Sequence, residues 1–366
     1  MGILRLILAL SVVIAHAGPI AGFHFVGGLI AVKTFFIISG FYMSMVLNEK
    51  YTGKNNSYAL FISNRFLRLF PIYWTILLLT IITCTVVAFR DGVANTPIFN
   101  QYYSINHSFT SLFFLIFTNL LIFGQDAVMF MGITPESGNL FFTSDFTQTG
   151  PALYHSLFVP QAWSLGLEMM FYVLAPFILK KGIKPVLALF AVSLATKLYI
   201  YFGLGFKHDP WIYRFFPAEL MFFLAGYLSY RLLKFTETMR IPSWVSALAC
   251  LWVFAFTILY SKIPTMGFSE WHKEILYYVG VLAALPLVFR IFKHLKTDAW
   301  IGELSYPIYI SHIFIILCVQ SFGFHLSGLT VTMGTLGLSI LLNHFIAAPI
   351  EKLRQARINR NSDPDH

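Results

Sequence analysis

The sequence predicts an all-α membrane protein with about ten transmembrane helices, one re-entrant or interfacial segment and both termini in the cytoplasm. Three observations support this fold class. Of the 366 residues, 57% are hydrophobic, only 11% are charged, and the mean hydropathy is +0.72; a soluble domain carries about 25% charged residues. Apolar runs of about 20 residues, the length that crosses a bilayer, recur along the chain. The basic residues cluster at the ends of these runs.

The predicted spans follow one another closely, and no connection is long enough to form a separate soluble domain. We therefore expect one transmembrane domain over 1–350 and a short polar cytoplasmic tail, frayed in solution, over 351–366. The predicted spans cover residues 3–22, 28–48, 69–89, 153–179, 185–204, 212–230, 242–261, 274–292, 300–320 and 327–349.

The apolar segment 111–131 is an eleventh candidate span, and the distribution of basic residues decides how to count it. With ten spans and the N-terminus inside, every cytoplasmic connection is basic, as the positive-inside rule requires; one of them holds Lys180, Lys181 and Lys184. A crossing at 111–131 would move the later basic clusters outside and would bring 132–150, which has no Lys or Arg, inside. The segment is therefore predicted to be re-entrant or to lie along the outer interface.

Charge and cysteine content narrow the range of partners. A net charge of +9 can indicate nucleic-acid binding, but basic residues at helix ends indicate membrane topology instead, so we expect the lipid bilayer and no nucleic acid as a partner. Cys84, Cys250 and Cys318 are scattered in apolar stretches without metal-ligand spacing. We predict neither a disulfide framework nor a metal site, and the sequence does not indicate an oligomeric state.

The first span places an arginine and a histidine on one helix face. Arg5 and His16 are eleven residues apart, which at about 100° per residue returns to nearly the same face about 16 Å along the axis. Ionisable groups inside hydrocarbon are costly and usually mark function. Two interpretations stay open: a functional pair, or a cytoplasmic anchor at Arg5 with His16 bonded to a neighbouring helix.

Arg65 and Arg68 project together from the cytoplasmic start of the third span because they are three residues apart. Arginine suits phosphate, since its planar fork donates hydrogen bonds in pairs and keeps its charge. The alternative is an ordinary topology signal at a helix end. Arg5 on the same side favours phosphate binding, because three cations can then converge on one polyanion.

The second span carries Lys33 near its outer end and Ser39-Gly40 further along. Lys33 has two open roles, snorkelling to the interface or contacting an anionic substrate. The pair Ser39-Gly40 favours close helix approach over nucleophilic catalysis by Ser39, because no Gly-x-Ser-x-Gly elbow surrounds it.

Ser164, Glu168 and Tyr172 follow at four-residue spacing and share one helix face. A carboxylate well inside a span needs a partner or a proton, so Glu168 is predicted to be functional. It would either position a catalytic histidine or bind substrate. Trp163 is expected to be an interface anchor or a wall of the site.

The ninth span reads Ser-Tyr-Pro-Ile-Tyr-Ile-Ser-His over 305–312. Its proline and tyrosines, including Tyr309, predict a kinked, polar-lined helix beside a cavity. His312 is expected at the same mid-membrane depth as His16, and two such histidines favour a functional role for both.

Taken together, these stretches resemble the acyltransferase-3 family of integral membrane acyltransferases. The similarity covers nearly the whole chain, and its specificity comes from the order of the motifs. They are Arg-x10-His (Arg5, His16), Phe-Phe-Ile-Ile-Ser-Gly-Phe, Arg-x-x-Arg with Pro-Ile-Tyr-Trp (Arg65, Arg68), Trp-Ser-Leu-x-x-Glu-x-x-Phe-Tyr and Ser-Tyr-Pro-Ile-Tyr-x-x-His. Lys33 departs from the resemblance, since many members have an acidic or neutral residue there.

The resemblance implies transfer of an acyl group, usually acetyl, from cytoplasmic acetyl-CoA or another acyl-CoA to a sugar hydroxyl of a bacterial envelope glycan, an exported polysaccharide or a lipid-linked sugar. It implies a multi-pass protein of the bacterial inner membrane, with His16 and Glu168 as catalytic residues and Arg5, Arg65 and Arg68 on the donor side. The absence of an esterase-like domain leads us to expect a single-domain member. The alternative function is a polytopic transporter or proton relay that uses His16, Glu168 and His312.

Overall fold

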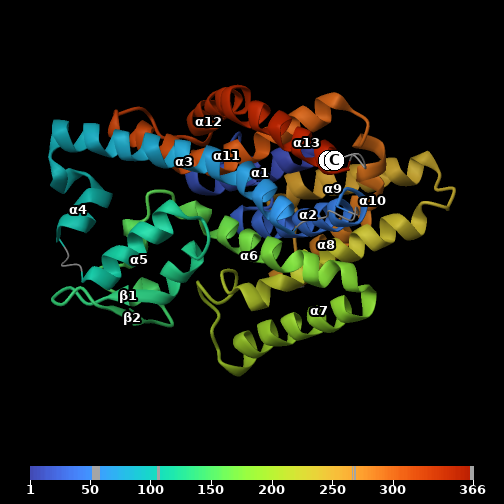
Figure 1. The fold of residues 1–366 in the computed structure, drawn as a ribbon, viewed down its shortest axis with the longest axis horizontal. Helices are drawn as coiled ribbons and strands as arrows, with labels where there is room; N and C mark the ends of the chain where they lie inside the picture. Colours follow the sequence, from blue (N-terminus) through green and yellow to red (C-terminus); the bar gives the residue numbers. More distant parts are fainter. Residues whose placement is uncertain (52–57, 105–107, 266, 268, 363–366) are drawn as a thin grey trace.

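The computed structural model describes residues 1–51, 58–104, 108–265, 267 and 269–362. Most of these residues are helical, as predicted, and a short antiparallel hairpin of β1 (Met131–Ile133) and β2 (Leu140–Phe142) forms the sheet (Figure 1). The α-helices are α1 (Gly2–Ala17), α2 (Gly28–Glu49), α3 (Tyr58–Asp91), α4 (Pro97–Ser104), α5 (Phe109–Leu120), α6 (Trp163–Ile178), α7 (Ile183–Leu198), α8 (Phe216–Thr236), α9 (Ser243–Leu259), α10 (Glu270–Phe292), α11 (Lys296–Ser321), α12 (Gly328–Leu342) and α13 (Ala348–Ser362).

Short helical turns extend or connect these helices. Two are π-helical, η7 (Tyr199–Gly203) after α7 and η9 (Asn343–Ala347), which joins α12 to α13. The 3-10 turns are η1 (Val93–Asn95), η2 (Gln125–Phe130), η3 (Phe146–Gln148), η4 (Leu153–Ser156), η5 (Pro160–Ala162), η6 (Leu179–Lys181) and η8 (Tyr260–Lys262).

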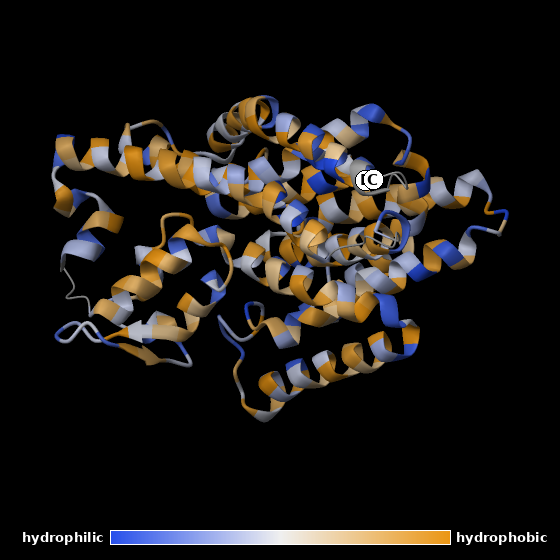
Figure 2. Ribbon diagram, viewed as in Figure 1, coloured by the Kyte–Doolittle hydropathy of each residue, from blue (hydrophilic) through white to orange (hydrophobic). Residues whose placement is uncertain are grey.

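Within the described residues, eight helical stretches are long and apolar enough to cross a membrane. The shorter α1 and the less apolar α8 stand where two further spans were predicted, so a helix lies at each of the ten predicted ranges. Figure 2 shows hydrophobic residues along most of α3 and α7 and hydrophilic residues at the turns. The chain is therefore an all-α, multi-pass membrane protein.

One set of helix ends meets on the side that carries the basic connections. The Met1 ammonium group lies 2.5 Å from Asp298 Oδ2 and joins the start of α1 to the start of α11. Lys180 donates to the Tyr51 carbonyl over 3.1 Å and joins the turn after α6 to the segment just after α2. The contact between Met1 and Asp298 brings the starts of α1 and α11 together, so these two helices run in the same direction.

The opposite helix ends meet on the other side. Arg90, at the end of α3, donates to the Ser321 carbonyl at the end of α11 over 2.6 Å. Gly18 after α1 lies against Gly328 at the start of α12, where a Cβ added to Gly328 would lie 2.1 Å from the Gly18 oxygen. Helices α1, α3 and α11 therefore run in one direction, and α12 runs in the opposite direction.

The segment predicted to be re-entrant contains α5, which is too short to cross a bilayer. Its 12 residues extend about 18 Å, against a hydrocarbon thickness of about 30 Å. Its last turn lies beside the middle of α3, because Tyr73 donates to the Asn119 carbonyl over 2.6 Å and Trp74 donates to the Leu120 carbonyl over 2.8 Å. These bonds satisfy backbone groups that lipid could not, and the chain then turns back through η2.

The C-terminal segment differs from its prediction. A frayed tail was expected from residue 351, but α13 continues as a helix to Ser362; residues 363–366 lie outside the described part of the chain. The helix is held because Arg357 donates to Ser63 Oγ over 2.8 Å and to Asn64 Oδ1 over 3.1 Å at the start of α3. The polar sequence of this segment predicted a frayed tail, whereas the hydrogen bonds to α3 keep the segment helical.

The backbones of α2 and α8 approach each other closely, and two glycines make this possible. A Cβ added to Gly40 would lie 1.9 Å from the Phe223 carbonyl oxygen, and one added to Gly226 would lie 2.0 Å from the Ile37 oxygen. The two backbones touch, as small residues allow in membrane helices. The predicted role of Gly40 in close helix approach is therefore confirmed.

Replacing Gly40 by alanine is expected to lower the apparent unfolding temperature in detergent, because α2 and α8 must separate to admit the methyl group. Overpacking costs about 1–3 kcal/mol. Gly337→Ala in α12 is the matched control, since nothing lies within 4 Å of its added Cβ and alanine favours a helix. Equal unfolding temperatures for the two variants would contradict the packing argument.

Candidate functional site

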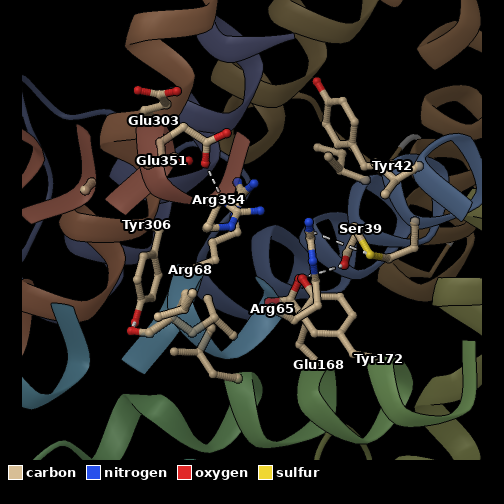
Figure 3. Close-up of a pocket in the computed structure, with 18 of the residues that line it drawn as sticks. Ser39, Tyr42, Arg65, Arg68, Glu168, Tyr172, Glu303, Tyr306, Glu351 and Arg354 are labelled. Atoms are coloured by element: carbon tan, nitrogen blue, oxygen red, sulfur yellow. Dashed lines mark hydrogen bonds and ion pairs between the residues drawn. The ribbon is translucent and has the colours of Figure 1, made fainter. Parts of the chain in front are cut away.

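A cavity of about 390 Å³ opens where the first halves of α1, α3, α6 and α11 meet α2. It lies on the side that carries the basic connections. Its walls come from α1, α2, α3, α6, α11 and α13, so segments from both ends of the sequence build it. Figure 3 labels several of the polar and aromatic residues around this opening. Eight of the residues singled out in the sequence line it, namely Arg5, Ser39, Arg65, Arg68, Ser164, Glu168, Tyr172 and Tyr309.

Arg5, Arg65 and Arg68 line this one cavity although they come from two helices. Arg65 is only 4% exposed and lies against the rings of Phe61 and Tyr172, 5.7 and 5.9 Å from their centroids. Its Nε is buried without a hydrogen-bond partner, and its Nη1 reaches only the Met43 sulfur, at 3.9 Å. Among the described residues, none of these three arginines forms a salt bridge with a carboxylate. The cavity therefore offers unused guanidinium donors, which suit a phosphorylated ligand.

Glu168 lies in the same cavity as the acceptor of two hydroxyl groups. Ser39 Oγ donates to Glu168 Oε1 over 2.6 Å, and the Tyr172 hydroxyl donates to the same oxygen. The four-residue spacing on α6 brings Tyr172 back over Glu168, and α2 supplies Ser39 from the facing wall. These two donated hydrogen bonds hold the carboxyl group of Glu168 in one position.

The inner end of the cavity is closed by a short hydrogen-bond chain. The Tyr309 hydroxyl donates to the Gln161 carbonyl over 2.8 Å. Its hydrogen is then used, so Ser164 Oγ, 2.6 Å from the Tyr309 oxygen, must be the donor in that pair. Ser164 is thus engaged with Tyr309, and its role is to fix this ring at the end of the cavity.

His16 and His312 lie side by side beyond that inner end. Their ring centroids are 5.0 Å apart, which follows from the parallel course of α1 and α11. His16 is exposed at the last turn of α1, whereas His312 is fully buried. The Nδ1 atoms lie 3.0 Å from the Val12 carbonyl and 2.6 Å from the Tyr309 carbonyl, respectively. Carbonyls only accept, so each Nδ1 carries a proton, and in the neutral ring Nε2 is the nitrogen that can accept one.

Aromatic side chains separate the histidine pair from the cavity. Neither His16 nor His312 lines it. Tyr309 forms the link, since it lines the cavity and its ring centroid is 6.0 Å from that of His312. Phe35 packs edge-on against Tyr309 with a centroid separation of 6.5 Å. A ligand in the cavity would have to pass these two rings to reach His16.

Two other residues singled out in the sequence lie away from the cavity. Lys33 is buried on the α8 side of α2, with its Nζ 5.6 Å from the centroid of the Phe222 ring. Trp163 is covered by Arg214, whose guanidinium carbon is 4.3 Å from the ring centroid. Contact with an anionic substrate was one of two roles left open for Lys33, and forming a wall of the site was one of two for Trp163. In the structure, α2 and α6 turn these two side chains toward other neighbours.

The sequence interpretation missed the contribution of α13. Glu351 and Arg354 line the cavity and pair with each other across one helical turn. Their spacing of three residues was visible in the sequence, but both lie in 351–366, which was predicted only as a polar tail. Among the described residues, no group of three or more His, Cys, Asp and Glu side chains is placed to hold a metal ion.

Comparison with known proteins agrees with this architecture. A family profile described as an acyltransferase domain matches residues 1–346, and the profile is that of acyltransferase-3 proteins. An uncharacterized protein of Aquifex aeolicus (strain VF5) is 27% identical over 161 residues, which cover 42% of this chain and 68% of that protein. No solved structure matches the chain at a significant level. The match over almost the whole chain favours a membrane acyltransferase over a transporter, and the protein belongs to the acyltransferase-3 family.

Proposed function

We propose that this membrane acyltransferase moves an acetyl or other short acyl group from cytoplasmic acyl-CoA to a hydroxyl of an envelope or exported polysaccharide, in the bacterial inner membrane. The observation that carries the proposal is the cavity that Arg5, Arg65 and Arg68 line at the basic end of the helix bundle. The positive-inside rule assigns this end to the cytoplasm, where acyl-CoA is found.

The cavity suits the two chemically different ends of an acyl-CoA. The nucleotide end is polyanionic and matches the arginines near the mouth. The pantetheine arm is slender and mostly uncharged, and the inner walls there are formed by apolar side chains that include Val32, Phe35 and Ile38. In this orientation the thioester points toward Tyr309 and, beyond it, His16.

His16 would serve as the base of the transfer step. Its Nε2 takes the proton of the acceptor hydroxyl while the hydroxyl oxygen attacks the thioester carbonyl carbon. The carbon–sulfur bond then breaks, and the CoA thiolate leaves and takes the proton from the imidazolium. An acyl-His16 intermediate, formed by attack of Nε2 on the same carbon, is the second route. The roughly 16 Å from Arg5 to His16 along α1 is a distance that a pantetheine arm covers.

Glu168 is proposed to contact the donor, and His16 is proposed to meet the acceptor from the outer side of the membrane. Glu168, fixed by Ser39 and Tyr172, lies along the path of the pantetheine arm and can accept hydrogen bonds from its amides. His16 is exposed at the end of α1 that faces away from the basic side, so a polysaccharide hydroxyl would reach it from outside the cell membrane. Donor and acceptor would then meet at His16 from opposite sides.

The proposal is tested with purified protein, radiolabelled acetyl-CoA and a panel of membrane and exported glycans. We expect release of free CoA together with label in an alkali-labile ester on one glycan. An N-acetylated product would contradict the hydroxyl acceptor. If no glycan in the panel gave CoA release or a labelled product, that result would contradict the acyl-CoA donor.

A further inference from the structure

Helix α13 forms one wall of the arginine cavity, although it lies outside the region that matches the family. The family match ends at residue 346, and α13 begins at Ala348. Its residues nevertheless line the cavity over more than two helical turns: Ile350, Glu351, Arg354, Gln355 and Ile358. This wall is therefore a feature of this chain that the family match does not explain.

Arg354 is the buried cation of this wall. It is 4% exposed, its Nε has no hydrogen-bond partner, and its Nη1 pairs with Glu351 one turn earlier. Figure 3 shows Arg354 extending into the same opening as Arg65 and Arg68. A buried cation costs free energy unless it is paired, and here Glu351 is the partner that neutralises it.

The position of α13 is fixed relative to the other arginines. Arg357, one turn beyond Arg354, donates to Ser63 Oγ over 2.8 Å and to Asn64 Oδ1 over 3.1 Å. Asn64 precedes Arg65 in α3, and it donates in turn to the Tyr51 hydroxyl over 3.0 Å. The bonds made by Arg357 therefore hold α13 against the start of α3, so that Arg354 and Arg65 line one cavity from two helices and can both contact one ligand.

We infer that Arg354 binds the 3′-phosphate of coenzyme A and that Glu351 holds its guanidinium until the donor arrives. The inference rests on the proposed acyl-CoA donor. The thioester must point inward, toward Tyr309, so the phosphate farthest from it, the 3′-phosphate, lies nearest the mouth. Helix α13 is the wall at that mouth. A phosphate with close to two negative charges displaces the single charge of Glu351 from Arg354.

The test measures the affinity of the purified full-length protein for coenzyme A and for dephospho-coenzyme A, which lacks only the 3′-phosphate. Arg354→Gln is expected to raise the Kd for coenzyme A by about 10- to 100-fold, the range for loss of hydrogen bonds to a charged group, and to leave the Kd for dephospho-coenzyme A unchanged. Lys352→Gln is the matched control, because Lys352 is an exposed cation on the same helix; neither Kd should change.

Glu351→Gln tests the second half of the inference. Removing the competing carboxylate is expected to lower the Kd for coenzyme A several-fold. A higher Kd would overturn the role of Glu351 as a holding group. Arg354→Lys keeps the charge and is expected to give an intermediate Kd for coenzyme A, and the unfolding temperature of each variant shows whether it is folded.

Three outcomes would overturn the inference, and they differ from one another. If Arg354→Gln raised the Kd for coenzyme A and the Kd for dephospho-coenzyme A equally, Arg354 would contact the diphosphate instead of the 3′-phosphate. Unchanged affinity for both would remove Arg354 from the donor site while leaving the proposed donor intact. Failure of the unmodified protein to bind coenzyme A would contradict the proposed function itself, and the inference with it.

Discussion

Replacing His16 by alanine is expected to reduce acyl transfer by about 10²- to 10⁴-fold, the contribution of a positioned general base, while the Kd for coenzyme A stays within about twofold. The separation follows from geometry. His16 does not line the cavity that holds the arginines, and Phe35 and Tyr309 lie between them. Loss of the imidazole therefore removes the chemical step and leaves the phosphate contacts in place. Radiolabel transfer and equilibrium binding measure the two effects separately.

His24→Ala is the control for this variant, because His24 is exposed in the connection that follows α1 and has no proposed role. It should transfer at the unmodified rate. Full activity of His16→Ala would show that another group is the base. His312 would be the next candidate, because its Nε2 has no hydrogen-bond partner and its ring centroid lies 5.0 Å from that of His16. Equal loss of transfer and of binding would instead indicate that His16 contacts the donor.

The parts of the site that the sequence predicted are those set by spacing within one helix. Ser164, Glu168 and Tyr172 share a face because they are four residues apart, and all three line the cavity. Arg65 and Arg68 share a face for the same reason. Helices lie at the ranges that hydropathy predicted as spans, since lipid requires every spanning backbone group to be bonded within its own helix.

The parts that the sequence did not predict depend on how helices turn toward one another. Lys33 and Ser39 lie on the same helix, yet Ser39 bonds Glu168 in the cavity and Lys33 lies beside Phe222. Which face of α2 meets α8 is decided by Gly40, whose backbone touches that of Phe223, and hydropathy does not reveal this choice. Helix α13 was missed because its sequence is polar, and its order comes from Arg357 bonded to α3.

Replacing Arg65 by glutamine is expected to raise the Kd for coenzyme A by about 10- to 100-fold, because a charge-assisted hydrogen bond in a buried site is worth about 1.5–3 kcal/mol. Arg65 is 4% exposed and has no carboxylate partner among the described residues, so its fork is free for a phosphate. The turnover rate at saturating acetyl-CoA should change little, since a contact to the nucleotide end acts equally on the bound donor and on the transition state.

Two further variants make the Arg65 prediction specific. Arg65→Lys should restore only part of the affinity, because lysine keeps the charge but loses the paired donors that match a phosphate. Arg240→Gln removes the same charge from an exposed position in the connection after α8 and should leave the Kd unchanged, which excludes a general effect of net charge. If Arg65→Gln lowered the turnover rate while the Kd stayed constant, Arg65 would act on the reacting thioester and the donor would lie in the opposite orientation, with its nucleotide end away from the mouth.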